Sequence, residues 1–442
     1  MNMNYRITAT THAGFSKAKS TDGKDFIVPF GCPEDEVELE IFGRPGNKKA
    51  AISKIINPSP RRVPCRCPHA GSVGSVFKKC GGCSFQYIDY PKQLEEKKRL
   101  ILEEMARKKV TDPVADVIPS PQIFGYRNRM DFVVGANKEL GLREKGSFRH
   151  MVDLKECHLI SPKMDAVRKM LRTWLEKSPI VGWNRETDKG HLRYIVLRET
   201  KNTGQLAVIF ITYEENIDEY WDDLSSILPP EVTHVFCGVQ TTASDTSVAE
   251  NYQVYKGKDY LEESIGGVTY LIRPGSFFQT NTDGATKLLD YVLGLSQKTG
   301  AKHILDWYCG SGFFSLPMAK HAQEVVGVEL DPAAIAVAKE SVALNKITNA
   351  KFYDMDVIDF PLDSKYDLLI VDPPRAGLHP KVLAHILEIK IPHLIYVSCN
   401  FEALAFQLKL LGQVYDIESI HPFDLFPHTP HVEVVVKMKV KS

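Results

Sequence analysis

The chain has 442 residues, more than one ordinary hydrophobic core organises, so two or three domains are expected. Its 43% hydrophobic and 25% charged residues are typical of a soluble globular protein, and no apolar run is long enough to cross a bilayer. The N-terminus lacks the apolar stretch of a signal peptide, so the cytoplasm is the expected compartment. The net charge of +0 hides a basic stretch at residues 44–109, with 16 Lys or Arg against 5 Asp or Glu. Such a stretch is either a solvated face or a phosphate-binding surface.

The first sixty residues show short alternating runs separated by turns. FIVPF (26–30), VELEIF (37–42) and KAAISKII (49–56) are strand-like, with DGK, GCPED and RPGNK as turn signals. The pattern predicts a small closed β-barrel of the OB type, an architecture that often binds nucleic acid, over residues 1–60.

Residues 61–275 predict a central α+β domain. A charged amphipathic helix is expected at 91–109, with Pro91 in its first turn. Strand-like runs follow at MDFVVG, RYIVLRE, QLAVIFIT, THVFCGVQ and TYLIRP.

Five of the nine cysteines belong to this central region: Cys65, Cys67, Cys80, Cys83 and Cys157. An odd total in a chain with no secretion signal argues against a disulfide framework. A C-x-x-C pair with further cysteines indicates a metal site, and zinc and a [4Fe-4S] cluster both accept four thiolates. A redox motif of the thioredoxin type is less favoured, because CGGC does not stand in a βαβ context.

From residue 276 to 442 the pattern changes to strand, turn, helix. KHILDWY, VVGVEL, YDLLIVD and HLIYVSC are buried-strand runs, and PAAIAVAKESVALNK is helical. This alternation predicts an α/β domain with a parallel sheet covered by helices on both faces. Ligands of such sheets bind beyond the carboxyl ends of the strands.

Several motifs stand at those strand ends. In DWYCGSGFF (306–314), Gly310 and Gly312 allow a tight turn close to a ligand. Nineteen residues after Gly310, Glu329 ends the next strand and is placed to accept both ribose hydroxyls of an adenosine. Asp356 is a weaker candidate, for the adenine amino group.

The remaining candidates follow in the same region. Asp372 is held in a rigid Pro-Pro turn, and Cys399 ends a buried strand beside the expected crevice. Glu433 begins a strongly apolar strand, where a charge needs a reason. Gln279 and Asn281 either contact a ligand or cap the helix that follows. His428 and His431 are expected to shape their loop rather than bind metal.

In chain order, these motifs resemble the RNA 5-methyluridine (uracil-C5) methyltransferase family. The blocks that carry the resemblance are SFFQTNT, DWYCGSGFFSLP, VDPPRAGL, YVSCN and FPHTPHVE, together with CPH…CGGC, GYRNRMDF and HLRYIVLRE. The first sixty residues resemble a TRAM domain, an OB-type RNA-binding module. The resemblance is therefore to the iron–sulfur branch that modifies 23S rRNA, with the tRNA T-loop enzymes as the alternative.

This resemblance implies a Rossmann-like catalytic domain that transfers a methyl group from S-adenosylmethionine to C5 of a uridine. It implies that Cys399 is the nucleophile, Glu433 the base and Asp372 an acid facing substrate and cofactor. The cofactor-contact positions that it implies are Gln279, Tyr308, Gly310, Glu329, Asp356 and Asp372. The cluster ligands that it implies are Cys67, Cys80, Cys83 and Cys157. Structured RNA is the expected partner, and a monomer without membrane contact is expected.

The sequence departs from the family pattern at three places, and two other functions are alternatives to RNA uracil methylation. The spacing from Cys67 to Cys80 is longer than in the family, which leaves Cys65 open as the first ligand. Phe313 stands where relatives carry a polar Asn, and Trp307 replaces an aliphatic residue. A decayed RNA-binding protein is disfavoured by the intact Cys399 and Glu433. An exocyclic-amine methyltransferase is disfavoured because Arg375, and not an aromatic residue, follows the two prolines.

Overall fold

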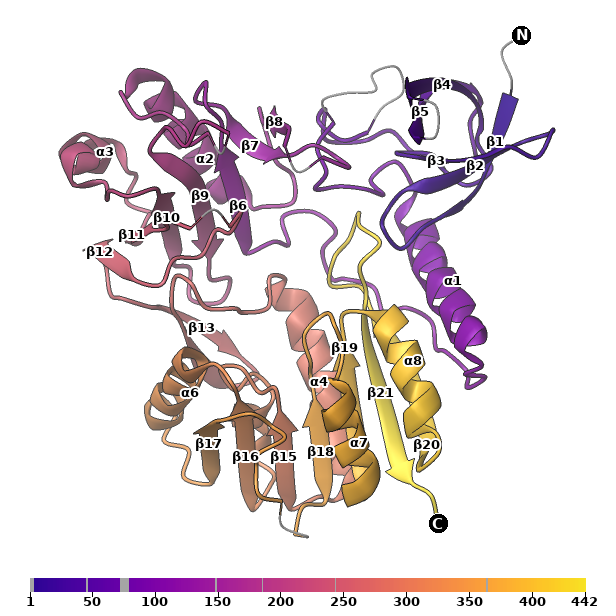
Figure 1. Ribbon diagram of the computed structural model, residues 1–442. Coiled ribbons are helices and arrows are strands. Elements are labelled where there is room, and N and C mark those ends of the chain that lie inside the picture. The colour runs from indigo at the N-terminus through magenta and orange to yellow at the C-terminus, as the bar shows by residue number, and fades with distance from the viewer. Residues whose placement is uncertain are drawn as a thin grey trace.

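The computed structural model describes residues 4–44, 47–71, 79–147, 149–184, 186–242, 244–362 and 365–442. Within these ranges the chain forms three larger sheets and a separate hairpin (Figure 1). No helix in these ranges is both long and apolar enough to cross a membrane.

The N-terminal sheet has five antiparallel strands in the order β3-β2-β1-β4-β5. Its strands are β1 (Asn4–Thr10), β2 (Ser16–Ser20), β3 (Asp25–Val28), β4 (Glu36–Arg44) and β5 (Asn47–Asn57). Alternating apolar side chains such as Ile7, Ala18 and Val37 form a small core of its own. The predicted closed barrel is not confirmed, because among the described residues the edge strands β3 and β5 do not pair and the sheet stays open. Strands β1 and β2 have no counterpart among the predicted runs.

The central sheet has seven strands in the order β12-β11-β10-β9-β6-β7-β8. They are β6 (Arg129–Val134), β7 (Leu140–Arg143), β8 (Met151–Asp153), β9 (Leu192–Glu199), β10 (Leu206–Thr212), β11 (His234–Val239) and β12 (Tyr252–Lys256). Helix α2 (Pro162–Lys177) packs on β9, and the short α3 (Trp221–Ile227) lies nearby. Among the described strands of this sheet, β10 and β11 run parallel and the other neighbours run antiparallel, so the sheet is mixed.

The C-terminal sheet has the order β17-β16-β15-β18-β19-β21-β20. Its strands are β15 (His303–Trp307), β16 (Glu324–Glu329), β17 (Ala350–Asp354), β18 (Leu368–Val371), β19 (His393–Ser398), β20 (Tyr415–Phe423) and β21 (Glu433–Val440). Strands β15 to β19 are parallel, and β21 runs antiparallel to both neighbours. The order reverses between β15 and β18, which makes the crevice beyond their carboxyl ends the expected ligand site.

Helices cover both faces of this sheet, as predicted. Successive strand residues point to opposite faces, and the two cores follow that alternation: Ile304 packs with one and Leu305 with the other. The first face carries α4 (Thr282–Thr299), α5 (Ser315–Met318) and α6 (Pro332–Leu344). The second carries α7 (Pro380–Ile389), α8 (Phe401–Leu411) and α1 (Tyr90–Lys108).

Two segments of the predicted central region pack on the C-terminal sheet instead. Helix α1 lies along α8, and the chain after it forms bridges with β20 at Ile420 and Phe423. The hairpin of β13 (Leu261–Ile265) and β14 (Val268–Ile272) packs against α6. The apolar face of α1, with Leu100, Ile101 and Met105, is buried in the core on the second face of the C-terminal sheet. The boundaries at residues 60 and 275 therefore separate sequence patterns, whereas the packing places α1 and this hairpin with the C-terminal sheet.

Candidate active site

The predicted nucleophile and base stand at the adjoining ends of two antiparallel strands, β19 and β21. Ser398, the last residue of β19, pairs with Val434 of β21. Cys399 directly follows Ser398 and Glu433 directly precedes Val434, so the two lie close together, and the charge of Glu433 acts on the Cys399 thiol. Asp372 directly follows β18, the other neighbour of β19. The order of the sheet thus gathers all three predicted catalytic residues.

The electrostatics of this group are those of a desolvated acidic site. Burial raises the pKa of the Glu433 carboxyl to about 7, and the nearby Arg375 opposes the shift. Burial also raises the pKa of Asp372 well above its ordinary value, to which the charges of Glu433 and Asp306 add. Shifts of this kind in clustered groups are characteristic of functional sites.

The Cys399 thiol is half-buried and shares these surroundings. Burial raises its pKa to about 11, the charges of Glu433 and Asp372 add to the rise, and Arg375 lowers it. Arg375 is exposed, and its Nη2 lies 3.3 Å from Nδ1 of His431. Asn400, which caps α8, donates from its amide to the Arg375 carbonyl at 2.8 Å, so the turn after β18 is tied to the turn after β19.

Four of the predicted cofactor positions, Tyr308, Gly310, Glu329 and Asp356, lie at or just beyond the ends of β15, β16 and β17. Tyr308 has a φ of 62°, an uncommon conformation for a residue other than glycine, at the start of the Gly-rich turn. Burial raises the pKa of its phenol to about 12. The charges of the nearby Asp356 and Glu329 contribute to this rise of the pKa. Glu329 Oε2 accepts from the Gly310 N–H at 3.2 Å, and Oε1 accepts from the Leu330 N–H at 2.8 Å.

The Gly-rich turn requires its glycines. Gly310 and Gly312 have φ values of 52° and 85°, and a Cβ on Gly312 would lie 3.0 Å from the Phe352 ring. The buried ring of Phe313 packs in an aromatic group with Tyr270, Phe278 and Phe314. Its ring anchors this turn to the segment before α4, which carries Gln279.

Gln279 and Asn281 have different roles in the structure. Asn281 caps α4, because its Oδ1 accepts from the Gly284 N–H at 2.9 Å, and its amide donates to the Leu425 carbonyl. The Gln279 side chain is buried but not used as a cap, which leaves it for a ligand. Trp307 is a core residue, stacked on His385 at 5.9 Å.

Two residues of this site were not among the predicted ones. Asp306 is fully buried in β15 and accepts a hydrogen bond from Ser315, and burial raises its pKa to about 7. Its Oδ1 has no hydrogen-bond partner among the described residues. The sequence signal for Asp306 is a carboxylate within the otherwise apolar run HILDWY. In the sequence, Arg375 stands out only because it follows two prolines where an exocyclic-amine methyltransferase has an aromatic residue.

The cysteines of the central region gather at a different place. Cys67, Cys80, Cys83 and Cys157 are buried and line one small cavity, whereas Cys65 lines a neighbouring pocket and donates to the Gly71 carbonyl. None of the nine cysteines, all within the described ranges, forms a disulfide. In those ranges no three thiol, imidazole or carboxylate groups stand close enough to hold one metal ion, so a mononuclear zinc site is not supported. Most of the insertion after Cys67, residues 72–78, lies outside the described residues.

Comparison with known proteins decides the family. Residues 89–441 match the family tRNA (uracil-5-)-methyltransferase. The chain belongs to this family. A Pyrococcus furiosus tRNA (uracil(54)-C(5))-methyltransferase is 36% identical over 96% of this chain and 99% of its own. A Pyrococcus horikoshii protein of the same description is 37% identical over 94% of this chain and 95% of its own.

A solved structure agrees with the sequence comparison. The crystal structure of Pyrococcus abyssi tRNA (uracil-54, C5)-methyltransferase with S-adenosyl-L-homocysteine has a TM-score of 0.81 and 33% identity, covering 99% of this chain and 100% of that one. Like other members of the family, the chain is an S-adenosylmethionine-dependent RNA (uracil-C5)-methyltransferase. The predicted preference for 23S rRNA is not supported, because these relatives are named as tRNA enzymes, which favours the tRNA alternative.

Proposed function

We propose that this enzyme methylates C5 of the uridine at position 54 of tRNA, using Cys399 as a covalent nucleophile. The observation that carries the chemistry is the closeness of Cys399, directly after β19, to Glu433, the first residue of β21, beside the strand ends that form the cofactor crevice. The choice of tRNA rests on relatives that align over nearly the full length of both chains.

The chemistry explains why both residues are needed. C5 of uracil is a poor nucleophile until the Cys399 sulfur adds to C6 and converts the ring into an enolate. S-adenosylmethionine, when bound, supplies an activated methyl group to C5. Glu433 then takes the C5 proton, the electrons of that C–H bond restore the C5–C6 double bond, and the C6–S bond breaks to return the thiolate. Asp372, directly after β18 at the mouth of the sheet, faces both substrate and cofactor.

The cofactor site in this proposal uses residues at three strand ends. Glu329 accepts from the ribose hydroxyls, Asp356 faces the adenine, and Tyr308 and Gly310 form the turn beneath them. Gln279 and Asp372 complete the site toward the methyl group. Aligning donor and acceptor in this way is worth roughly 7–11 kcal/mol of the barrier.

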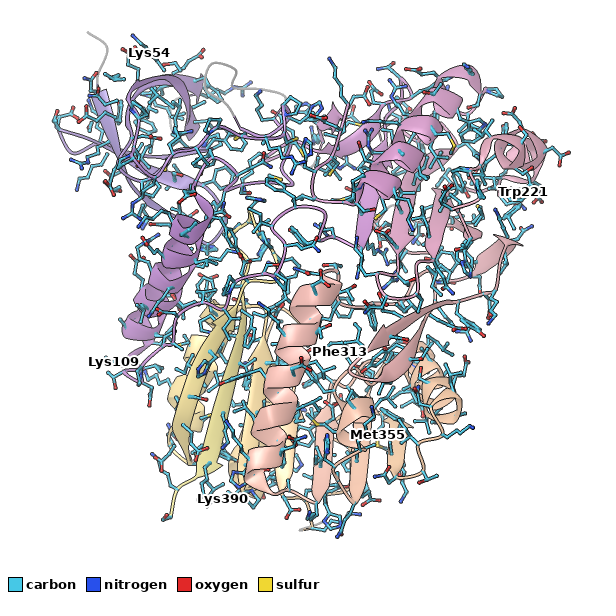
Figure 2. All side chains as sticks on the ribbon, turned by 180° about the vertical axis from the view of Figure 1, so that it is seen from behind. Lys54, Lys109, Trp221, Phe313, Met355 and Lys390 are labelled. Atoms are coloured by element: carbon cyan, nitrogen blue, oxygen red, sulfur yellow. The ribbon has the colours of Figure 1, made fainter. Side chains whose placement is uncertain are left out.

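RNA binding is assigned to the N-terminal sheet, which we propose is a TRAM-like module. Seven of the cations of the basic stretch are paired with carboxylates: Arg61, Arg62, Lys92, Lys97, Lys98, Arg99 and Arg107. By contrast Arg44, Lys48, Lys49 and Lys54 are exposed on β4 and β5, the last of them visible at the outer edge of the molecule in Figure 2. These side chains are the better candidates for phosphate contacts.

The substrate is tested by transfer of labelled methyl to three RNAs: unmodified tRNA, the same tRNA with cytidine at position 54, and a large-subunit rRNA fragment. We expect methylation of the first alone. Methylation of rRNA in preference to tRNA would contradict the choice of substrate and leave the chemistry intact.

The cysteine cavity is proposed to hold a [4Fe-4S] cluster on Cys67, Cys80, Cys83 and Cys157. Four buried thiols outside any disulfide supply the donor set that such a cluster takes, and each thiolate binds a different iron, so the sulfurs need not converge on one point. Anaerobically purified protein should contain iron and labile sulfide, both lost in Cys80→Ala and retained in Cys65→Ala. Bound zinc without iron would contradict the assignment.

The pKa values predict the direction of the pH dependence. Only the ionised form of Glu433 can take a proton, and its pKa is about 7, so turnover should rise as pH increases from about 6 to 8. The thiol of Cys399, with a pKa of about 11, shifts activity in the same direction. Initial rates at saturating tRNA and S-adenosylmethionine provide the test, and a rate that falls over this range would contradict the roles of both groups.

A further inference from the structure

The loop of residues 424–432, between β20 and β21, leads directly into Glu433, and almost all its anchors lie outside the C-terminal sheet. Figure 1 shows this loop in yellow, rising from the sheet toward the region where the N-terminal and central sheets approach each other. Its backbone accepts from the Tyr126 hydroxyl at Pro427 and from the Phe85 N–H at His428, at 3.1 and 2.8 Å. The position of Glu433 therefore depends on contacts made far from it in the sequence.

The first strong anchor is a buried ion pair with helix α1. Lys97 Nζ lies 2.6 Å from Asp424 Oδ1, and both side chains have 0% exposure. The same ammonium donates to the Phe426 carbonyl at 3.0 Å, and the Tyr90 hydroxyl donates to Asp424 Oδ2 at 3.0 Å. Breaking a buried pair by removing one partner leaves an uncompensated charge, so this pair specifies one loop position strongly.

The second anchor holds an unusual backbone conformation. His428 has a φ of 66°, which a residue other than glycine adopts only when its surroundings fix it. The fully buried Gln93 of α1 does so at both ends of its amide: Oε1 accepts from the His428 N–H at 2.9 Å, and Nε2 lies 3.1 Å from the His428 Nδ1. The Phe124 ring stacks on the His428 ring at 4.4 Å.

We propose that Lys97 and Gln93 are positioning residues for Glu433, holding residues 424–432 so that the carboxylate meets the C5 proton. The inference rests on the proposed role of Glu433 as base. Neither side chain belongs to the group around Cys399, and each acts on the first residue of β21 only through the loop. Loss of either anchor lets the start of β21 shift while Cys399, on β19, keeps its place, so proton removal slows more than methyl transfer.

The test measures both steps in the same reaction. A single turnover on tRNA with tritium at C5 of its uridines and carbon-14 in the methyl donor gives the rate of methyl transfer and the rate of tritium release. Because both rates come from the same active molecules, their ratio is independent of the fraction of misfolded protein. The variants are Lys97→Met, Gln93→Leu and, as a matched control, Lys98→Met, which removes the neighbouring lysine and its 2.7 Å pair with Asp116.

We expect the ratio of tritium release to methyl transfer to fall by about 10- to 100-fold in Lys97→Met and Gln93→Leu, since a displacement of about 1 Å can cost that much. Lys98→Met should match the wild type. Gln93→Leu leaves no buried charge without a partner, so it provides the test if Lys97→Met does not fold. An unchanged ratio in Gln93→Leu would overturn the inference. An equal fall of the ratio in Lys98→Met would overturn it too. A wild-type enzyme that transfers methyl without releasing tritium would instead contradict the proposed function.

Discussion

Replacement of Cys399 by alanine is expected to abolish both methyl transfer and the covalent complex with RNA. Without the sulfur, C6 of the uracil has no partner, so C5 never gains the electron density needed to accept a methyl group. The binding of S-adenosylmethionine should persist, because the Cys399 side chain is not among the proposed cofactor contacts. Labelled methyl in RNA and a protein–RNA band that survives denaturing electrophoresis measure the two losses.

The matched control is Cys237→Ala, since Cys237 is a buried cysteine at β11 of the central sheet. This variant removes a sulfur at no proposed functional position, so it should turn over as the wild type does. Turnover by Cys399→Ala at the rate of this control would show that the enzyme does not use covalent catalysis by Cys399.

Glu433→Gln should also lose turnover, but its covalent complex with RNA should be enriched rather than lost. Glutamine keeps the shape of the side chain but cannot take the C5 proton, and general-base steps of this kind contribute about 10²–10⁴-fold. Addition of Cys399 and methyl transfer precede that step, so the methylated RNA should remain attached to the protein. Gel-resolved label in the protein–RNA band measures this accumulation.

The stability of Glu433→Gln separates its effect from unfolding. The raised pKa of about 7 means that the ionised form is disfavoured in the folded state, so replacing it by a neutral amide should not lower stability above pH 7. Glu418→Gln on β20, which removes a partly exposed pair with Lys437, is the control. Loss of turnover without an enriched complex would contradict the assignment of Glu433 as base.

The C-terminal domain was predictable because its signals are local. The apolar runs of β15, β16, β18 and β19 and the turns that follow them are all contained in short sequence windows. In a parallel sheet the carboxyl ends of the strands meet at one edge, so the candidates after those strands had to gather there. Glu433 was detectable as a charge at the start of an apolar strand.

The features that were not predicted depend on distant pairing. Lys97 and Asp424 are 327 residues apart in the sequence, and a lysine in a charged helix gives no sign that it is buried. The amphipathic pattern of α1 indicates an apolar face but not which sheet covers it. Whether the N-terminal sheet is open or closed likewise depends on whether its edge strands form hydrogen bonds with each other. The alternation of apolar and polar residues along each strand does not determine this.

The choice between RNA substrates could not be made from the sequence for a related reason. The cysteines and the strand-rich N-terminus indicated a branch of the family by association, whereas the uridine is selected by the surface that the RNA contacts. In the proposed function, part of that surface is the set of exposed basic side chains on β4 and β5, and no short motif reports where they lie relative to the active site.

The covalent step is tested most directly with tRNA in which 5-fluorouridine replaces uridine. Fluorine at C5 leaves no proton for Glu433 to remove, so the methylated ring should stay bonded to the enzyme. Mass spectrometry of the digested complex should then find a methylated, fluorinated nucleotide on the peptide that contains Cys399. Methylated RNA with no protein attached, or attachment at another residue, would contradict the account.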